Sequence, residues 1–311
     1  MMLRFTCSAV LGCCAILAVS DMSQLVAQQF HIDHVTVAGK NVEAMTKALS
    51  SVGGITAQYG GPHSNNATEM AIASFPDGSY LELIAIQPKA DPAALAAHYW
   101  HKFMEADAGP CAWAIRPADF AAEGARLLVS KIEVSEPRKS GRKRPDGVQL
   151  DWETAQVGPT NGGFFPFLIH DFTPRDNRAF PSGKPAVQGW TGIARVVIAV
   201  RDLDAAIAQY RQAYWIDPPE RQDDAEFGAR LAWFRGTPVV LAAPLSAKSP
   251  LSTKSWLSAR LESFGEAPCA FILGPRKGSS VMAGAKSKWF GHSVFWADAE
   301  KLGWHLGFEP K

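Results

Sequence analysis

The sequence predicts an α+β fold built of tandem βαβββ modules, and the whole arrangement is duplicated along the chain. Residues 30–54, FHIDHVTVAGKNVEAMTKALSSVGG, have the pattern of a strand, a turn and an amphipathic helix. A similar segment returns at residues 192–215 as GIARVVIAVRDLDAAIAQYRQAYW. Three pairs of anchors lie 161, 159 and 158 residues apart: His34 and Arg195, Phe75 and Phe234, Cys111 and Cys269. Anchors in register indicate an internal duplication, which decides the fold more strongly than any single motif.

The first strand should place alternate side chains on opposite faces. Its two expected faces are Ile32, His34 and Thr36 on one side, and Asp33, Val35 and Val37 on the other. A helix is predicted from Asn41, whose side chain can cap free N–H groups, to Ser51. The glycines at 53–54 should end that helix, because glycine tolerates a left-handed turn.

A later strand, in FPDGSYLELIAI, follows a turn at Asp77-Gly78. Its two expected faces are Tyr80, Glu82 and Ile84 on one side, and Leu81, Leu83 and Ala85 on the other. The rest of the first half is expected as a helix over 92–105, a strand at 111, a helix over 119–128, a strand at 132–134, the charged loop RKSGRKRPDG, and the strands GVQLDWETAQV and NGGFFPFLIHDF. The Pro- and Gly-rich residues 174–189 are the expected boundary between the halves.

Size and composition describe a globular protein of two ordinary domains. The chain has 311 residues, of which 47% are hydrophobic and 20% are charged. A net charge of +1 gives no reason to expect a nucleic-acid partner. We therefore predict a first domain over residues 30–180 and a second domain over 189–311.

The N-terminus has the pattern of a secretory signal peptide. Arg4 precedes an apolar run over residues 5–19, which is shorter than the roughly 20 residues of a membrane-spanning helix. Cleavage is expected after Ser20 or after Ala27, and the second choice gives a signal peptide of residues 1–27. The alternative is a lipid anchor on Cys13. The mature protein is therefore expected to be secreted or periplasmic, without stable membrane insertion.

Only two of the five cysteines, Cys111 and Cys269, fall outside the predicted signal peptide. They lie in duplicated strands, GPCAWAIRP and APCAFILGP, so the simpler interpretation is two small buried core residues. A disulfide between them is the alternative, although equivalent positions in two repeats need not touch.

Several motifs resemble those of the vicinal oxygen chelate superfamily. They are the strand-helix-three-strand unit, AVRDLDAAIAQY followed by Tyr214-Trp215, and FPDGSYLELI. More narrowly, IDHVTVAGKNVE, SYLELI, RPDG followed by LDWE, and GGFFPFLIHDF resemble the bacterial glyoxalase-like domain of that superfamily. The resemblance covers residues 31–180, and 190–245 more loosely. It implies paired βαβββ modules of the glyoxalase, bleomycin-resistance and extradiol-dioxygenase type, curled into two half-open barrels whose concave faces hold a metal or a small ligand.

The resemblance also implies metal ligands in the first and last strand of each module. His34 and Glu82 match these positions in the first module, and His170 is the candidate in the second, where the first-strand position falls near Cys111 or Trp113. Two histidines and one carboxylate leave open positions on a divalent ion, here Zn, Fe, Mn or Ni. The alternatives are a structural role for His34 and no metal at all. Glu82, a carboxylate between leucines, is also the candidate catalytic residue.

Other residues are candidates for binding a substrate. Tyr80 shares a strand face with Glu82, and His63 lies in the polar loop over residues 60–66. The charged run over 138–144 is expected to be a solvated loop, from which Arg144 is selected because RPDG matches the family pattern. In the second half, Arg195 and Val240 occupy the positions of His34 and Glu82, so no metal is expected there. His292 and His305 are interpreted as packing or surface residues.

These observations predict an exported, glyoxalase-like metalloenzyme that acts on a small oxygen-rich molecule as an isomerase, lyase or dioxygenase. The competing hypothesis is a metal-free protein that sequesters a small ligand on the same concave face. The partner is a small molecule in both cases, and a homodimer is left open because barrels of this superfamily pair within or between chains.

Overall fold

The computed structural model describes residues 30–160, 162–245, 255–275 and 284–310. Its first half contains eight strands: β1 (Ile32–Gly39), β2 (Gln58–Pro62), β3 (Thr68–Ser74), β4 (Tyr80–Ile86), β5 (Gly109–Ile115), β6 (Arg138–Lys143), β7 (Gln149–Ala155) and β8 (Phe167–Asp171). Its helices are α2 (Val42–Gly53), α3 (Pro92–Ala96), α4 (His101–Glu105), α5 (Phe120–Val129) and α6 (Arg175–Ala179). The predicted signal peptide lies outside the described residues.

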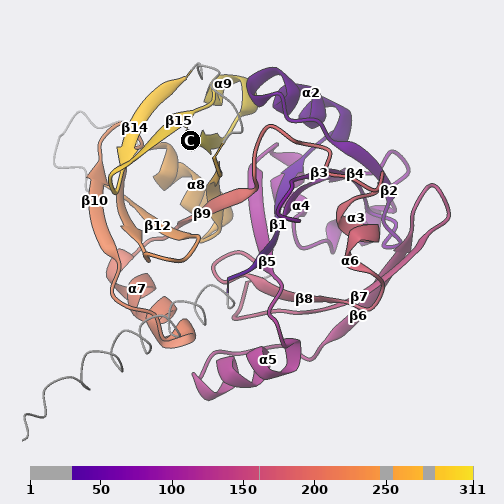
Figure 1. Ribbon diagram of the computed structural model, residues 1–311, viewed down its shortest axis with the longest axis horizontal. Coiled ribbons are helices and arrows are strands. Elements are labelled where there is room, and N and C mark those ends of the chain that lie inside the picture. Colours follow the sequence, from indigo (N-terminus) through magenta and orange to yellow (C-terminus); the bar gives the residue numbers. More distant parts are fainter. Residues whose placement is uncertain (1–29, 161, 246–254, 276–283, 311) are drawn as a thin grey trace, which may run out of the picture.

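The eight strands form one curled sheet in the order β2-β3-β4-β1-β5-β8-β7-β6. β1 and β5 are antiparallel neighbours at its centre, and each pairs in parallel with the last strand of its own module. This is the order that two βαβββ modules give when they join through their first strands. The predicted α+β fold of duplicated βαβββ modules is confirmed, and Figure 1 shows the two curled sheets side by side.

The second half repeats this order as β10-β11-β12-β9-β13-β16-β15-β14. Its strands are β9 (Ile193–Ala199), β10 (Glu220–Asp224), β11 (Ala229–Trp233), β12 (Val239–Pro244), β13 (Pro268–Leu273), β14 (Ala285–Trp289), β15 (His292–Trp296) and β16 (His305–Phe308). Its helices are α7 (Leu203–Tyr214), α8 (Trp256–Phe264) and α9 (Ala299–Leu302).

The duplication holds at the level of single contacts. Thr36 lies opposite Glu82 between β1 and β4, and Val197 lies opposite Val240 between β9 and β12. The Cys111 thiol lies 3.5 Å from the Thr36 carbonyl oxygen, and the Cys269 thiol lies 3.4 Å from the corresponding carbonyl of Val197. Both cysteines are buried and free, so they are core residues and not a disulfide. Burial raises the pKa of Cys269 to about 12.

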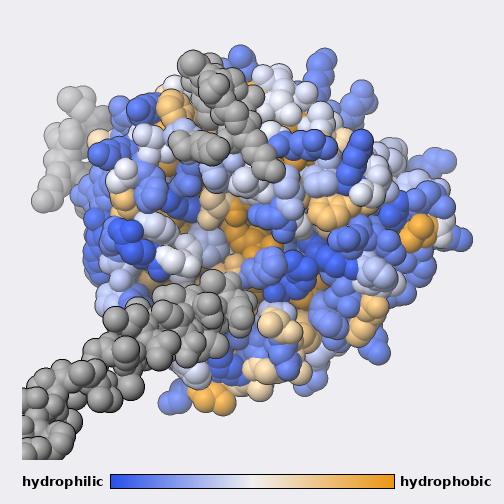
Figure 2. All heavy atoms as spheres, in the orientation of Figure 1, coloured by the Kyte–Doolittle hydropathy of each residue, from blue (hydrophilic) through white to orange (hydrophobic). Residues whose placement is uncertain are grey.

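A continuous hydrophobic core joins the two halves. One cluster of buried residues takes members from both sheets, including Val35 and Leu83 in the first and Ile198 and Leu241 in the second. On the face drawn in Figure 2, hydrophobic residues gather near the centre, where β1, β5 and β9 lie in Figure 1, and hydrophilic residues surround them. The outer faces of the two sheets therefore stabilise each other by packing in a shared core. Their concave faces point away from this core and can bind a ligand or be covered by other side chains.

The concave face of the second sheet carries mainly apolar side chains. Phe227, Trp289 and Trp296 pack together there with ring centroids about 5.0 Å apart. Arg195, the counterpart of His34, forms an ion pair of 2.7 Å with Glu309 and lies over the Trp233 ring. The polar chemistry of the first sheet has no equivalent among the described residues of the second.

Three local predictions were wrong. The helix expected over 92–105 is broken into α3 and α4 by a turn at residues 97–100, which frees His98 and Trp100 to face inward. Much of the expected charged loop is the edge strand β6, because its backbone pairs with β7 from Arg138 to Lys143. The expected strand at 132–134 is a single bridge between Val134 and Val157.

Two boundaries were predicted closely. Asn41 caps α2 by accepting a hydrogen bond from the Ala44 N–H, and Gly54 ends it at φ 62°. Asp119 caps α5 in the same way through the Ala122 N–H. Within the described part of the chain, no helix is both long and apolar enough to cross a membrane.

Arg260 connects the two halves. Its guanidinium donates to the carbonyls of Ala108 and Pro110 in the first half and of Pro268 in the second, with distances of 2.7 Å to Ala108 and 2.8 Å to Pro268.

We expect Arg260→Met to lower the free energy of unfolding by about 3 kcal/mol, because buried carbonyls lose a charged donor. Urea unfolding measures the change. The matched control Arg230→Met, at an exposed position of β11, should stay within about 0.5 kcal/mol of wild type. Equal effects of the two substitutions would contradict this role.

Candidate functional site

A cavity of about 280 Å³ opens on the concave face of the first sheet. Polar side chains from both modules line it, and aromatic side chains form much of the remaining wall. The lining residues are His34, His63, Ser64, Asn65, Met70, Tyr80, Glu82, Ile84, His98, Trp100, Ser140, Gly141, Arg142, Trp152, Thr154, Phe167, Ile169 and Arg178. His34 and Glu82, which were predicted to face a common hollow, are both among these lining residues.

His34 is held by the residue before it in the chain. The pairing of β1 with β5 shifts register between Ile32 and His34, which leaves Asp33 without an opposite residue. This bulge brings Asp33 and His34 side chains together, so that the Asp33 Oδ1 lies 2.6 Å from the His34 Nδ1. The strict alternation expected for this strand, with Asp33 on the other face, was therefore wrong. An ionised Asp33 accepts the Nδ1–H and leaves Nε2 directed into the cavity.

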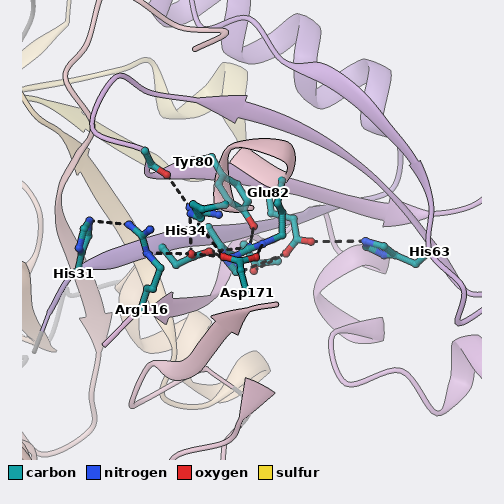
Figure 3. A network of polar contacts seen from close by, with 12 residues as sticks. His31, His34, His63, Tyr80, Glu82, Arg116 and Asp171 are labelled. Atoms are coloured by element: carbon teal, nitrogen blue, oxygen red, sulfur yellow. Dashed lines mark hydrogen bonds and ion pairs between the residues drawn. The ribbon is translucent and has the colours of Figure 1, made fainter. Parts of the chain in front are cut away.

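The Glu82 carboxylate lies between two imidazole rings (Figure 3). Its Oε2 is 3.6 Å from the His34 Nε2, and its Oε1 is 3.8 Å from the His63 Nε2. The Thr36 hydroxyl donates to Oε2 at 3.1 Å. The His63 Nδ1 is 2.8 Å from the Thr68 hydroxyl, so this ring also has its inner nitrogen occupied. Each histidine presents one nitrogen to one oxygen of Glu82.

Asp33 is the centre of a buried ion cluster behind His34. Arg178 of α6 binds both Asp33 oxygens at 3.0 Å and also binds Asp171, and Arg175 lies 3.1 Å from Asp33. Burial alone would raise the pKa of Asp33, but the two guanidinium groups outweigh it and hold that pKa well below its usual value. The carboxylate that orients His34 is therefore charged across the physiological range.

Burial lowers the pKa of two other imidazoles in the cavity, those of His63 and His98. It lowers the pKa of His63, with Glu82 opposing and Arg142 adding to the effect. It also lowers the pKa of His98, where the neighbouring His63 contributes. Both rings are therefore neutral near pH 7 and can accept or donate one hydrogen bond at each nitrogen.

The second module places apolar residues where the first has His34 and Glu82. Ala114 pairs with Phe167 as His34 pairs with Tyr80, and Ile169 follows Phe167 by two residues as Glu82 follows Tyr80. The expectation of Cys111 or Trp113 at the first of these positions was one residue or more out of register. His170 is likewise one residue beyond Ile169, and it is exposed on the other face of β8 beside Phe120 and Phe172.

Comparisons with known proteins agree with this architecture. Residues 32–214, more than half of the chain, match the family described as glyoxalase-like domain. The chain belongs to the glyoxalase-like domain family. It is accordingly a member of the vicinal oxygen chelate superfamily, as its motifs suggested. A search of curated proteins found no match.

Solved structures share the fold of this glyoxalase-like protein at low identity. A hypothetical protein from Staphylococcus aureus is 12% identical, with a TM-score of 0.61 over 91% of this chain and 100% of that one. A triple mutant of 4-hydroxymandelate synthase from Streptomyces coelicolor is 10% identical, with a TM-score of 0.55 over 90% of this chain and 92% of that one. Methylmalonyl-CoA epimerase from Mycobacterium tuberculosis is 18% identical and covers 39% of this chain and 89% of its own, with a TM-score of 0.32. At these identities the first two show the fold alone.

The glyoxalase-like cavity does not offer the donor set that the resemblance implied for a divalent metal. His34 and Glu82 are present, but Ala114 and Ile169 supply no donors, and His170 faces outward. Glu82 separates His34 from His63, so the three do not surround a common point (Figure 3). Among the described residues, no three histidine, cysteine, aspartate or glutamate side chains are grouped so that they could hold a metal ion. The residues present do not fit that metal centre.

The predicted substrate-binding residues divide between the cavity and its surroundings. Tyr80 and His63 line the cavity, whereas Arg144 does not. Arg144 instead donates to the backbone carbonyls of Asn177 and Pro181, which fixes the segment around α6. Arg142, two residues earlier, does line the cavity. Had the run been interpreted as a strand, period-two alternation would have placed Arg142 on one face with Ser140, which also lines the cavity.

Two further parts of the site were not predicted. His98 and Trp100 were placed within a continuous helix, and Arg178 was placed in the linker between domains, where the sequence gives no signal of its partner Asp33. A larger cavity of about 610 Å³ lies between α2 and the second half. Its one histidine, His305, stacks on Trp256, and burial lowers its pKa to about 4. The polar chemistry is concentrated in the smaller cavity.

Because the pKa of Asp33 is lowered in the folded protein, the free energy of unfolding should depend on pH in the acidic range. A carboxyl group whose folded-state pKa is lowered stabilises the fold above its unfolded value, near 3.8, and this contribution is lost as pH falls toward the folded value. We expect Asp33→Asn to lower the free energy of unfolding at pH 7 by about 3 kcal/mol, since Arg178 and Arg175 lose their partner.

The difference between Asp33→Asn and wild type should shrink below about pH 4, because the unfolded wild-type chain takes up a proton on Asp33 there while the folded protein keeps this group charged. Urea unfolding from pH 3 to pH 7 measures it, with Asp223→Asn at an exposed position of β10 as the control. A difference that stays constant over this pH range would show that the ion cluster does not stabilise the fold in this way.

Proposed function

We propose that this protein is an exported enzyme that binds a small oxygen-rich molecule in the cavity of its first sheet and moves a proton through Glu82. The observation that supports the proposal is the position of the Glu82 carboxylate. It is 13% exposed, it borders the cavity, and each of its oxygens faces an imidazole nitrogen. A carboxylate placed in this way is suited to take a proton from a bound molecule and to return it.

The proposed reaction is proton abstraction next to a carbonyl group. The C–H proton would pass to a Glu82 oxygen, and the electron pair of that bond would form an enolate on the substrate. Return of the proton to the same or a neighbouring carbon completes an isomerisation. His98, whose Nδ1 accepts from the Trp100 N–H, would bind the developing oxyanion through its Nε2–H in the cavity wall. His34 is the positioning partner whose orientation Asp33 fixes.

Membership of the superfamily supports a small-molecule ligand and leaves the reaction open, because one fold hosts many chemistries. The ligand is assigned from the cavity itself. Its volume of about 280 Å³ lies just below the range of drug-sized sites, which suits a small metabolite. Trp100, Trp152 and Phe167 contribute apolar surface to the cavity, and Glu82 and His34 contribute polar groups.

A second candidate function is sequestration of a small ligand without turnover. It is favoured by Ala114 and Ile169, which replace polar groups by hydrocarbon at half of the strand positions that the superfamily uses. Proton exchange distinguishes the two functions, since a sequestering protein binds a ligand but does not exchange its protons.

Export remains a proposal based on the N-terminal pattern over residues 1–27. Mass spectrometry of the mature protein from the periplasm or medium of its native host would test it, with an expected new N-terminus after Ser20 or Ala27. A mature protein that retains Met1 in the cytoplasm would contradict it. A homodimer likewise remains a prediction.

We expect Glu82→Gln to lower the rate of substrate proton exchange by about 10²-fold to 10⁴-fold, because the amide cannot accept the proton. NMR would follow replacement of C–H by C–D in D₂O for a panel of small 2-oxo acids, hydroxy ketones and their amides. Glu153→Gln is the matched control, because Glu153 lies between the cavity-lining Trp152 and Thr154 of β7 and does not itself line the cavity. Binding without exchange in wild type would support the sequestering function instead.

The incomplete donor set predicts weak metal binding. We expect elemental analysis of the purified protein to give well below one equivalent of divalent metal, and treatment with EDTA to leave proton exchange unchanged. Comparison with the double variant His34→Ala, Glu82→Ala makes the test specific to the cavity. One equivalent of metal in wild type that is lost from the double variant would restore the metalloenzyme hypothesis.

A further inference from the structure

Arg142 is a buried cation without a carboxylate partner. It projects from β6, its side chain is only 5% exposed, and one nitrogen, Nη1, donates to the Gly60 carbonyl at 2.6 Å. The other terminal nitrogen, Nη2, is buried and has no hydrogen-bond partner. The other arginines that are equally buried among the described residues have acidic partners, since Arg178 binds Asp33 and Arg195 binds Glu309.

An unpaired buried guanidinium is costly, so its retention needs a reason. Burial lowers the pKa of Arg142, while the more distant Tyr80 and Glu82 oppose that effect. Glu82 does not come within ion-pair distance, and no other carboxylate among the described residues pairs with Arg142. The missing negative charge must therefore come from outside the chain if Arg142 is to be satisfied.

A second unpartnered donor lines the same cavity. The Trp100 Nε1–H is buried and has no acceptor. The surrounding β2–β3 turn adds Ser64 and Asn65 to the wall. A cavity with two unpartnered N–H donors, one of them on a cation, fits a ligand rich in acceptor oxygens and bearing a negative charge.

Arg142 approaches the backbone of β2 closely at Gly60, a residue without a side chain. A Cβ at Gly60 would lie 2.3 Å from the Met70 sulfur and 3.5 Å from Arg142 Nη2. A larger residue at position 60 would therefore collide with the Met70 side chain, whereas its Cβ would meet the guanidinium at an ordinary contact distance. The β2 strand leaves room for Nη1 to bond the backbone while Nη2 stays free.

We propose that the ligand of this cavity is a small carboxylic acid whose carboxylate binds the free Nη2 of Arg142. This inference rests on the cavity of the proposed function and names the class of its ligand. The carboxylate accepts from Arg142, the Trp100 Nε1–H is available to a further ligand oxygen, and the hydrocarbon part of the acid packs on Trp152 and Phe167. Glu82 remains free for the proton that is exchanged.

The test compares small acids with their uncharged primary amides. Isothermal titration calorimetry would use pyruvate, phenylpyruvate and 3-phenylpropanoate, each with the matching amide. We expect at least one acid to bind wild type about 10-fold or more tightly than its amide, as a charge-assisted hydrogen bond predicts. Equal affinity for acids and amides, or no binding of any acid up to about 10 mM, would overturn the proposal.

Two variants assign that preference to Arg142. Arg142→Gln should raise the dissociation constant of the acid about 10-fold to 100-fold and leave that of the amide nearly unchanged. Arg138→Gln, at an exposed position of the same strand, is the matched control and should bind as wild type. Should Arg142→Gln fail to fold, as judged by thermal unfolding, Arg142→Lys keeps the charge and should retain part of the preference. An unchanged preference for acids in a folded Arg142→Gln protein would also overturn the proposal.

The outcome is independent of the proposed enzymatic activity. Selective acid binding that depends on Arg142, in a protein that exchanges no substrate protons, would uphold this inference and reject proton transfer by Glu82. Proton exchange that depends on Glu82 but ignores the charge of the ligand would do the reverse.

Discussion

The buried charge of Asp33 is the constraint on which the candidate site depends. A carboxylate with no exposure to water must be compensated, and Arg178 and Arg175 supply that compensation from a helix that follows the second module. Asp33 then holds His34, and His34 faces Glu82. The orientation of the imidazole is therefore set by residues more than 140 positions away in the chain. Folding of the segment that links the two halves completes the cavity in the first half.

The duplicated halves differ in what fills their concave faces. Their strands pair in the same order and the same register, yet Thr36 and Glu82 correspond to Val197 and Val240. In the second sheet, Phe227, Trp289 and Trp296 pack together, and Phe227 and Trp296 also line the larger cavity beside α2. One copy thus has a cluster of histidine and carboxylate side chains on its concave face and the other has mainly aromatic side chains there, while the core that they share stabilises both. The second half supports the site and supplies no side chain to the polar cluster.

Sequence patterns predicted the parts of the site that lie on regular strands. Tyr80, Glu82 and Ile84 line the cavity as their alternation required, because β4 pairs without interruption on both sides. Alternation failed at Asp33, where a bulge shifts the register, and the alignment was one residue out at His170, where register depends on a partner strand that the sequence does not identify. His98 and Trp100 were missed because their turn interrupts a segment of helical composition. Long-range ion pairs such as Arg178 with Asp33 have no local signal.

Arg142 and Glu82 carry opposite charges in the same cavity, yet they do not form an ion pair with each other. An ion pair between Arg142 and Glu82 would satisfy both groups, but it would also remove the proton acceptor and fill the space for a ligand. The structure keeps them apart by tying Arg142 to the Gly60 carbonyl and Glu82 to the Thr36 hydroxyl. An anionic ligand can then satisfy the guanidinium while the carboxylate stays available for chemistry. The lack of a carboxylate partner for Arg142 is therefore consistent with a cavity that binds a negatively charged molecule.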